Sequence, residues 1–302
     1  MQSLTYYLKN PKAILAGFVF HTNFFYPDSL YLRLMFWSQM GYKLNLKNPR
    51  TYSEKLQWIK LYDRNPFYTR LVDKIDVKYY IKERIGEEFI IKTLAIWNDV
   101  EDIQIDNLPN KFVLKTNCGG GSNGVIVCKD KNDFDIKEAK IKLKKSLNAN
   151  IYKTHREWPY KNVKPRIFAE EYMVDESGCE LKDYKFFCFG GKVKALFVAT
   201  ERYRGDHYVK FDYYDENFQH LDIRQSHLNS DNPLVVPPKN FEKMKQISEK
   251  LSEGLKHVRV DLYNINGRIY FGEMTFFHYS GLMPFKPKKW DYIWGNWLDL
   301  GI

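Results

Sequence analysis

The clearest alternation of apolar and polar residues lies near the C-terminus, over residues 256–277. Three apolar residues alternate with polar ones before the Asn266-Gly267 pair, and the alternation resumes after it; the three are Val258, Val260 and Leu262. A period of two residues is typical of a half-buried strand, and Asn-Gly is a common hairpin turn. The stretch therefore predicts a β-hairpin.

The length of the turn decides which side chains share a face of this hairpin. A two-residue turn would place Asp261 opposite Gly272, with Glu273 on the other face. A three-residue loop, with Gly267 as a left-handed bulge, would place Asp261 opposite Phe271. We predict the second register because it separates polar from apolar side chains. It gathers four polar residues on one face: Arg259, Asp261, Glu273 and Thr275.

Helical and strand-like segments are interspersed along the rest of the chain. Helices are expected over residues 13–20, 68–84, 136–147 and 241–255. A capping box of Thr51 with Glu54 predicts a further helix start, and Gly86 would end the helix over 68–84. Strands are expected over 89–94, 112–115, 125–128 and 166–173, with a second hairpin over 183–198 that turns at Gly190-Gly191.

Composition narrows the class of protein. The chain has 302 residues, of which 44% are hydrophobic, and this argues against disorder. Its net charge of +10 favours an anionic partner, but the lysines are spread along the chain, which argues against nucleic acid. The four cysteines lack CxxC spacing and are typical of buried thiols in a cytosolic protein. The apolar run over 13–20 is shorter than the ~18 residues that span a bilayer, so we expect a core helix, with a membrane-surface contact as the alternative.

A glycine-rich loop, Asn117 to Gly124, follows Lys115 and lies between two expected strands. Its consecutive glycines would let the backbone fold closely over phosphate and direct several N–H groups at it. The loop differs from a Walker A sequence and from GxGxxG, because both of those lead into a helix. A phosphate-binding flap and a plain hairpin loop both fit this stretch.

The predicted C-terminal hairpin carries two carboxylates, Asp261 and Glu273, on its polar face. Neighbouring carboxylates repel unless a cation or a proton lies between them. Carboxylate oxygens without histidine or cysteine suit Mg²⁺ or Mn²⁺, and Mg²⁺ commonly arrives with nucleotide phosphates. An ordinary surface strand with solvated acids is the alternative interpretation.

The order of these pieces resembles the ATP-grasp fold: a lysine at a helix start, a strand with a lysine and a glycine flap, a strand that ends Glu-Glu-Tyr-Met, and two hairpins. Five phrases look like the TupA-like branch of that family: NPRTYSEKLQW, DK-x-x-VK, DYKFFCFGGKV, RVDLY and FGEMTF. The resemblance covers about residues 28–300. This branch occurs in bacterial surface-polysaccharide loci, and its namesake is implicated in building teichuronopeptide, a peptide-bearing cell-wall polymer.

The resemblance implies an α+β chain with the ATP-grasp fold, in which a small lid domain and a larger antiparallel-sheet domain clamp a nucleotide. A helical segment would occupy residues 1–66. The N-terminal part of the fold would occupy residues 67–172, with the lid at about 88–170. The C-terminal domain, with the metal hairpin, would occupy residues 173–302.

Roles for individual residues follow from the same resemblance. Phosphate would be bound by two lysines and the flap: Lys74, Lys115, Asn117, Gly119, Gly120, Gly121 and Ser122. Adenine would be bound by a hinge, Glu170, Glu171, Tyr172 and Met173, and the ribose by Asp183, with Glu180 as the alternative. The metal would be bound by Asp261, Glu273 and Thr275; most relatives have asparagine in place of Thr275, so the number of metals stays open. The catalytic side chains would be Arg259 and Lys185, and Arg202 and Arg204 either bind the acceptor or are ordinary loop residues.

The implied activity is that of a carboxylate–amine ligase, which uses ATP and Mg²⁺ (or Mn²⁺) to form an amide through an acyl phosphate. The acid would be an amino acid or a uronic acid of a nucleotide-linked or lipid-linked glycan, and the enzyme would act in the cytoplasm or at the inner face of the membrane. A glycosyltransferase that uses a nucleotide sugar is the main alternative, followed by a kinase and a non-catalytic scaffold. The substrates and the oligomeric state stay open.

Overall fold

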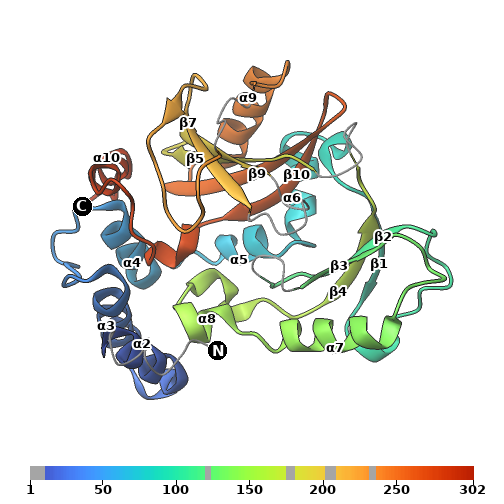
Figure 1. Ribbon diagram of the computed structural model, residues 1–302, viewed down its shortest axis with the longest axis horizontal. Helices are drawn as coiled ribbons and strands as arrows, with labels where there is room; N and C mark the ends of the chain where they lie inside the picture. Colours follow the sequence, from blue (N-terminus) through green and yellow to red (C-terminus); the bar gives the residue numbers. More distant parts are fainter. Residues whose placement is uncertain (1–10, 120–123, 175–180, 201–208, 231–235) are drawn as a thin grey trace.

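The structure is a computed structural model that describes residues 11–119, 124–174, 181–200, 209–230 and 236–302 (Figure 1). Within these residues, helices and two antiparallel sheets are mixed along the chain, which confirms the predicted α+β class. The smaller sheet has the strand order β1-β4-β2-β3 and the larger sheet the order β10-β9-β5-β6-β7-β8. Figure 1 shows the larger sheet in the upper part of the view and the smaller sheet at the right.

The smaller sheet carries the glycine-rich loop. Its strands are β1 (Thr93–Trp97), β2 (Phe112–Thr116), β3 (Val125–Cys128) and β4 (Ile167–Glu171). The amphipathic helix α7 (Ile136–Leu147) covers the sheet and contributes Leu143 to its core. The glycine-rich loop joins β2 to β3, as the sequence predicts. The predicted strand over 89–94 lies later, at β1, because residues Glu87–Phe89 form a short 3-10 helix, η2.

The larger sheet carries the two predicted hairpins. Its strands are β5 (Asp183–Phe189), β6 (Lys192–Thr200), β7 (Lys210–Asp215), β8 (His220–Leu221), β9 (His257–Ile265) and β10 (Arg268–Thr275). Every residue of β5 is buried, because this strand lies in the interior of the sheet. Helix α9 (Phe241–Ser252) packs its apolar face on β5, β6 and β9 through Met244 and Leu251.

The N-terminal helices form a separate layer that lies at the lower left of Figure 1. They are α2 (Pro11–His21), η1 (Asn23–Phe25), α3 (Asp28–Met40) and α4 (Tyr52–Tyr62), and the C-terminal helix α10 (Lys289–Trp297) packs on α4. The predicted capping box of Thr51 with Glu54 is present at the start of α4. Gly295 permits the close packing of α10, because a Cβ there would lie 2.2 Å from the carbonyl oxygen of Arg50.

Helix α2 differs from the core helix predicted over residues 13–20. Val19 is buried in the core of the N-terminal layer, but Ile14 and Phe18 are 50% and 60% exposed. In the following η1, Phe24 and Phe25 are 72% and 71% exposed. The prediction of a buried helix is therefore wrong for one of its faces. None of the described helices combines the length and the apolar character that a membrane span requires.

The helix predicted over residues 68–84 is interrupted. The structure has α5 (Phe67–Val72) and α6 (Val77–Arg84), separated by four residues. Asp73 adopts an extended conformation, and its Oδ1 accepts hydrogen bonds from the backbone N–H groups of Ile75 (2.8 Å) and Asp76 (3.2 Å). An aspartate side chain that bonds to nearby N–H groups competes with the helical hydrogen bonds, which explains the break. The break carries Lys74.

The C-terminal hairpin has a different turn from the one that we predicted. Ile265 pairs with Arg268, and Asn266 and Gly267 both have positive φ angles, so the turn has two residues. The predicted three-residue loop is wrong. A bulge at Gly272 then shifts the register by one residue, so that Glu273 pairs directly with Asp261. The prediction that the polar residues share one face is still correct. The two-residue turn alone would place Glu273 on the opposite face from Asp261, and the extra residue of the bulge returns it to the same face.

Candidate active site

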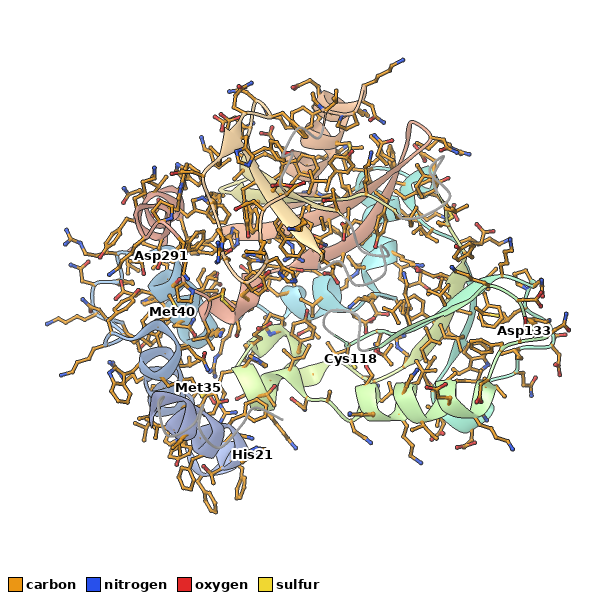
Figure 2. All side chains as sticks on the ribbon, viewed as in Figure 1. His21, Met35, Met40, Cys118, Asp133 and Asp291 are labelled. Carbon is orange, nitrogen blue, oxygen red and sulfur yellow. The ribbon has the colours of Figure 1, made fainter. Side chains whose placement is uncertain are left out.

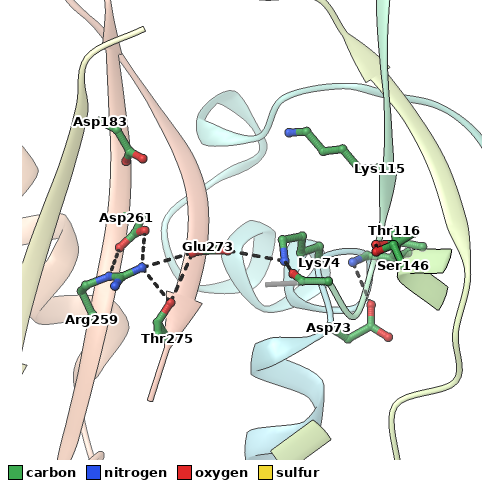
Figure 3. Close-up of polar contacts among 12 residues, drawn as sticks. Asp73, Lys74, Lys115, Thr116, Ser146, Asp183, Arg259, Asp261, Glu273 and Thr275 are labelled. Atoms are coloured by element: carbon green, nitrogen blue, oxygen red, sulfur yellow. Dashed lines mark hydrogen bonds and ion pairs between the residues drawn. The ribbon is translucent and has the colours of Figure 1, made fainter. Parts of the chain in front are cut away.

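Arg259 of β9 holds together the polar face of the C-terminal hairpin (Figure 3). Its Nε donates to Asp261 Oδ1 (2.6 Å), and its Nη2 donates to Asp261 Oδ2 (2.8 Å), Glu273 Oε1 (3.2 Å) and Thr275 Oγ1 (3.0 Å). Burial opposes the charge of the guanidinium, but Asp261 and Glu273 raise the pKa of Arg259 above its ordinary value. The cation that two adjacent carboxylates require is thus supplied by the protein.

Lys185 reaches the same face from the neighbouring strand β5. Its ammonium group contacts Asp261 and lies 2.6 Å from Asp183 Oδ2. Burial raises the pKa of Asp261 above its ordinary value, even though Arg259 and Lys185 beside it favour the charged form. Asp183 is almost completely buried against Lys185. This contact balances the charge of Asp183, and the ribose-binding role that the sequence suggested stays a prediction.

Lys74 links the hairpin to the glycine-rich loop. Its Nζ donates to the carbonyl oxygen of Gly119 (2.5 Å) and lies 3.4 Å from Glu273 Oε2. Figure 3 shows Lys74 between the hairpin strands on one side and the smaller sheet on the other. Burial alone would raise the pKa of Glu273, but Lys74, Lys185 and Arg259 outweigh it and hold this pKa well below its ordinary range. Glu273 is therefore an anion that faces three cations.

A second ionic cluster lies on the smaller sheet, around Glu170 of β4. The ammonium groups of Lys78 and Lys115 each lie 2.5 Å from one oxygen of the Glu170 carboxylate. Lys78 also donates to the Ile91 carbonyl (2.8 Å) and to Thr93 Oγ1 (2.7 Å). Burial would raise the pKa of Glu170, but the two lysines lower it. Lys78 received no role from the sequence, although it ends the DK-x-x-VK phrase.

Asn117 begins the glycine-rich loop, and its side chain is fully buried. Its Nδ2 donates to Asp73 Oδ2 (2.7 Å) and to the Lys164 carbonyl (2.9 Å), and its Oδ1 accepts from the N–H of Arg166 (2.7 Å). Both amide hydrogens are therefore engaged by protein acceptors. The contacts favour a role in positioning the loop against the α5–α6 break over direct binding of phosphate.

Two glycines shape the stem of the loop where it leaves the sheet. A Cβ at Gly119 would lie 2.6 Å from Thr116 Oγ1, and one at Gly124 would lie 2.2 Å from the same atom. Thr116 Oγ1 in turn lies 2.9 Å from Ser146 Oγ of α7, as Figure 3 shows. The close approach explains the requirement for glycine at these two positions.

The proposed adenine hinge continues from β4. The side chain of Glu171 is exposed, on the opposite side of the strand from Glu170, and the Glu171 N–H donates to the Lys92 carbonyl (3.1 Å). Tyr172 and Met173 are half-buried. Six other predicted site residues lie outside the described residues: Gly120, Gly121, Ser122, Glu180, Arg202 and Arg204.

His278, which the sequence did not single out, contacts Arg259 from the far end of the hairpin. It begins the short helix η5 (His278–Gly281), and its Nδ1 lies 3.0 Å from Arg259 Nη1. A guanidinium can only donate, so Nδ1 accepts and Nε2 carries the proton that it donates to Gln225 Oε1 (2.9 Å). Burial and the charge of Arg259 lower the pKa of His278 well below its ordinary value. The neutral imidazole thus orients Arg259.

The donor set of the hairpin suits a hard divalent cation. Asp261 and Glu273 place carboxylate oxygens opposite each other on paired strands, and oxygen is the donor that Mg²⁺ prefers. The Thr275 hydroxyl bonds to Arg259 and to Glu273 Oε1 (3.3 Å), which favours a role in holding Arg259. In the part of the chain that the structure describes, no three histidine, cysteine, aspartate or glutamate side chains gather into a metal cluster.

A family model identifies the family of this chain. A family model described as TupA-like ATPgrasp matches residues 54–299. Among solved structures, D-alanine–D-alanine ligase from Bacillus anthracis is 18% identical with a TM-score of 0.41, and 68% of this chain and 56% of that chain are covered. The corresponding ligase from Helicobacter pylori is 16% identical with a TM-score of 0.43, and 77% and 64% are covered.

An ADP complex of purK, N5-carboxyaminoimidazole ribonucleotide synthetase, is 15% identical with a TM-score of 0.44, and 74% of this chain and 50% of that chain are covered. The chain therefore spans only part of the length of these three solved structures. No curated protein matches the chain.

Proposed function

The chain belongs to the TupA-like ATP-grasp family, and from this premise we propose that it is an ATP-dependent ligase that joins a carboxylate to an amine. The observation that carries this proposal is the position of Lys74. This lysine contacts both the base of the glycine-rich loop and the carboxylate of Glu273, and thereby connects two elements that would enclose a triphosphate. A lysine, a glycine flap and hairpin acids are the groups that phosphoryl transfer requires.

The lysines would bind the phosphates of ATP. Lys74, Lys78 and Lys115 come from two elements, the α5–α6 region and β2, and the ammonium groups of all three lie against carboxylates. Phosphate oxygens can replace these carboxylates as acceptors, since both are anionic oxygen groups. The hinge at Glu170, Glu171, Tyr172 and Met173 would bind adenine at the far end of the same strand pair.

The reaction would proceed in two balanced steps. A carboxylate oxygen of the acid attacks the γ-phosphorus of ATP, the bond to the bridging oxygen breaks, and ADP leaves with that electron pair. The amine nitrogen then attacks the acyl carbon, the bond from carbon to the phosphate oxygen breaks, and phosphate and the amine proton are released. No nucleophilic side chain of the protein is required.

Arg259 would stabilise the oxyanion of the second step. Its guanidinium is fixed by Asp261, Glu273, Thr275 and His278, so little reorganisation is needed when negative charge develops. Asp261 and Glu273 would hold Mg²⁺ or Mn²⁺. When bound, the cation would neutralise charge on the transferring phosphoryl group.

The family resemblance supports a proposal for the class of substrate. We propose a role in a bacterial capsule or another cell-surface polysaccharide, with a uronic acid or an amino acid as the acid. The buried thiols of Cys118, Cys128 and Cys188 support a reducing, cytoplasmic location. The exposed Phe18, Phe24 and Phe25 on the N-terminal layer support a peripheral contact at the inner face of the membrane.

Nucleotide binding and product analysis test the proposal together. A ligand at 100 times its Kd stabilises the native state by about 2.7 kcal/mol, so Mg²⁺ with a non-hydrolysable ATP analogue should raise the melting temperature, and UDP-glucose should not. Lys115→Ala should reduce the shift, whereas Lys145→Ala on the exposed surface of α7 should not. Turnover with an acid and an amine should yield ADP and phosphate. ADP alone would indicate a kinase, and UDP or GDP a glycosyltransferase.

A further inference from the structure

A small cavity lies beside the glycine-rich loop, on the side away from the proposed hinge. Its volume is about 220 Å³, and its wall comes mainly from the segment between α7 and β4. The segment includes α8 (Ile151–His155) and η4 (Trp158–Asn162). Lining residues with polar side chains are Cys118, Asn148, Asn150, Lys153 and Tyr160. Figure 2 places Cys118 near the centre of the molecule.

The register of the smaller sheet places this cavity relative to the hinge. In the β2–β4 pair, Phe112 pairs with Glu171 at the hinge end, and Thr116 pairs with Ile167 at the loop end. The two ends are four residue steps apart along the strand, which corresponds to about 13 Å. The cavity lies at the loop end, because Cys118 follows Thr116 there. A nucleotide with its base at the hinge would direct its phosphates toward the cavity.

A short chain of contacts connects the cavity to the hairpin acids. Cys118 precedes Gly119, whose carbonyl oxygen accepts a hydrogen bond from Lys74, and Lys74 in turn contacts Glu273. Tyr160 lines the cavity from the other side. Burial raises the pKa of Tyr160, Glu157 and Glu273 raise it further, and Arg259 lowers it. The ionisation of Tyr160 is therefore coupled to the charges of Glu273 and Arg259.

The charge of the wall indicates the kind of molecule that fits. Among the described residues that line the cavity, none is acidic, and Lys153 contributes a positive charge. The carboxylate of Glu157, three residues before Tyr160, interacts with the buried ammonium of Lys60. Amide, hydroxyl and ammonium donors suit an anionic oxygen group. The volume is below the 300–1,000 Å³ of drug-sized sites, so a small metabolite is the appropriate size.

We propose that this cavity binds the acid substrate, a small polar carboxylic acid of amino-acid or sugar-acid type, with its carboxylate directed toward Lys74. The inference rests on the proposed function, because the cavity would position the acid that accepts the γ-phosphoryl group. The segment of residues 147–165 would then determine which acid is used. Tyr160 would donate a hydrogen bond to the bound acid.

Two substitutions test the location. Ala149 is exposed at the cavity wall, so Ala149→Phe should fill the cavity without disturbing the core. Tyr160→Phe removes a single hydroxyl. Lys142→Phe, on the exposed surface of α7, is the matched control for added bulk. The probes are D-alanine, L-glutamate, glucuronic acid and galacturonic acid, each with Mg²⁺ and a non-hydrolysable ATP analogue, with binding followed by saturation-transfer NMR and ADP release by chromatography with ATP.

We expect at least one acid of the panel to bind the wild-type protein, and both cavity variants to raise its Kd or KM by at least about tenfold. The melting shift with the ATP analogue should stay unchanged in all three variants. Comparison of binding by the amino acids with binding by the sugar acids shows which of the two kinds of acid the cavity accepts. Unchanged acid binding in Ala149→Phe and Tyr160→Phe would overturn the location. Failure of every acid to bind the wild type would overturn the substrate class, whereas failure of the ATP analogue to bind would overturn the proposed function itself.

Discussion

Replacing Glu170 by glutamine tests whether the ionic cluster on the smaller sheet is a real stabilising unit. The carboxylate of Glu170 is 7% exposed and contacts Lys78 and Lys115, whose side chains are 15% and 20% exposed. Glu170→Gln keeps the shape and one acceptor oxygen but removes the charge. Two lysines would then remain close together with no anion between them, which is unfavourable in a buried site.

The expected loss of stability follows from these contacts. Removing one partner of a buried ion pair costs about 3–5 kcal/mol when the other charge is left uncompensated. Both lysines retain some access to water, and Lys78 keeps hydrogen bonds to Ile91 and Thr93. The expected cost in stability therefore lies at the lower end of this range. We therefore expect Glu170→Gln to reduce the free energy of unfolding by about 3 kcal/mol at pH 7.

The pH dependence gives the sharper measurement. The pKa of Glu170 is lower in the folded protein than its ordinary value of about 4.3. Its stabilisation is therefore fully present above that ordinary value and is lost as the pH falls through the lower folded pKa. The difference between wild type and Glu170→Gln should stay constant from about pH 5 to 8 and shrink below about pH 4.

Urea unfolding of both proteins across this pH range is the assay, with Glu171→Gln as the control. Glu171 is the next residue on the strand, but its side chain is exposed, so its replacement should change stability by less than about 0.5 kcal/mol. An equal loss in the two variants, or a loss in Glu170→Gln that persists unchanged at pH 3, would refute the ionic interpretation.

Three further predictions concern the loop and the hairpin. Gly124→Ala should lower both the melting temperature and the affinity for an ATP analogue, since the new Cβ would meet the Thr116 hydroxyl at 2.2 Å; melting curves and titration measure this. His278→Asn should keep turnover within about threefold, because its Oδ1 can still accept from Arg259, whereas His278→Gln should lose about tenfold or more in kcat. Glu273→Gln should reduce Mg²⁺-dependent turnover by about 100-fold and should also lower the melting temperature, because Lys74 and Arg259 lose an anion that faces them; full activity would exclude it as a metal ligand.

The periodicity of the sequence was sufficient for most elements but not for the geometry of the C-terminal hairpin. Alternation required Asp261 and Glu273 on one face, and that is correct. A bulge at the turn and a bulge at Gly272 both place these two residues on the same face of the sheet, so the pattern could not distinguish the two positions of the bulge. The difference matters for the chemistry, because only the observed register pairs the two carboxylates directly.

The site shows a similar division between what sequence patterns reveal and what only the fold reveals. Lys74, Lys115 and the glycines stand in recognisable phrases, but Lys78 acquires its partner Glu170 only when α6 packs beside β4. Asp73 fits a continuous helix by pattern, and its competing hydrogen bonds depend on its local conformation. A single sequence contains no signal for contacts between residues so far apart along the chain.

The charges of the site suggest how a buried polar centre can be stable. Each cation that the proposed reaction would use already has an anion: Lys74 has Glu273, Lys115 and Lys78 share Glu170, and Arg259 has Asp261. Desolvating an unpaired charge would cost several kcal/mol, so these pairs allow the groups to be positioned in advance. In the proposed reaction, phosphate oxygens would become further acceptors for the lysines. Binding would depend on geometry more than on the cost of assembling the charges, because the cations are already in position.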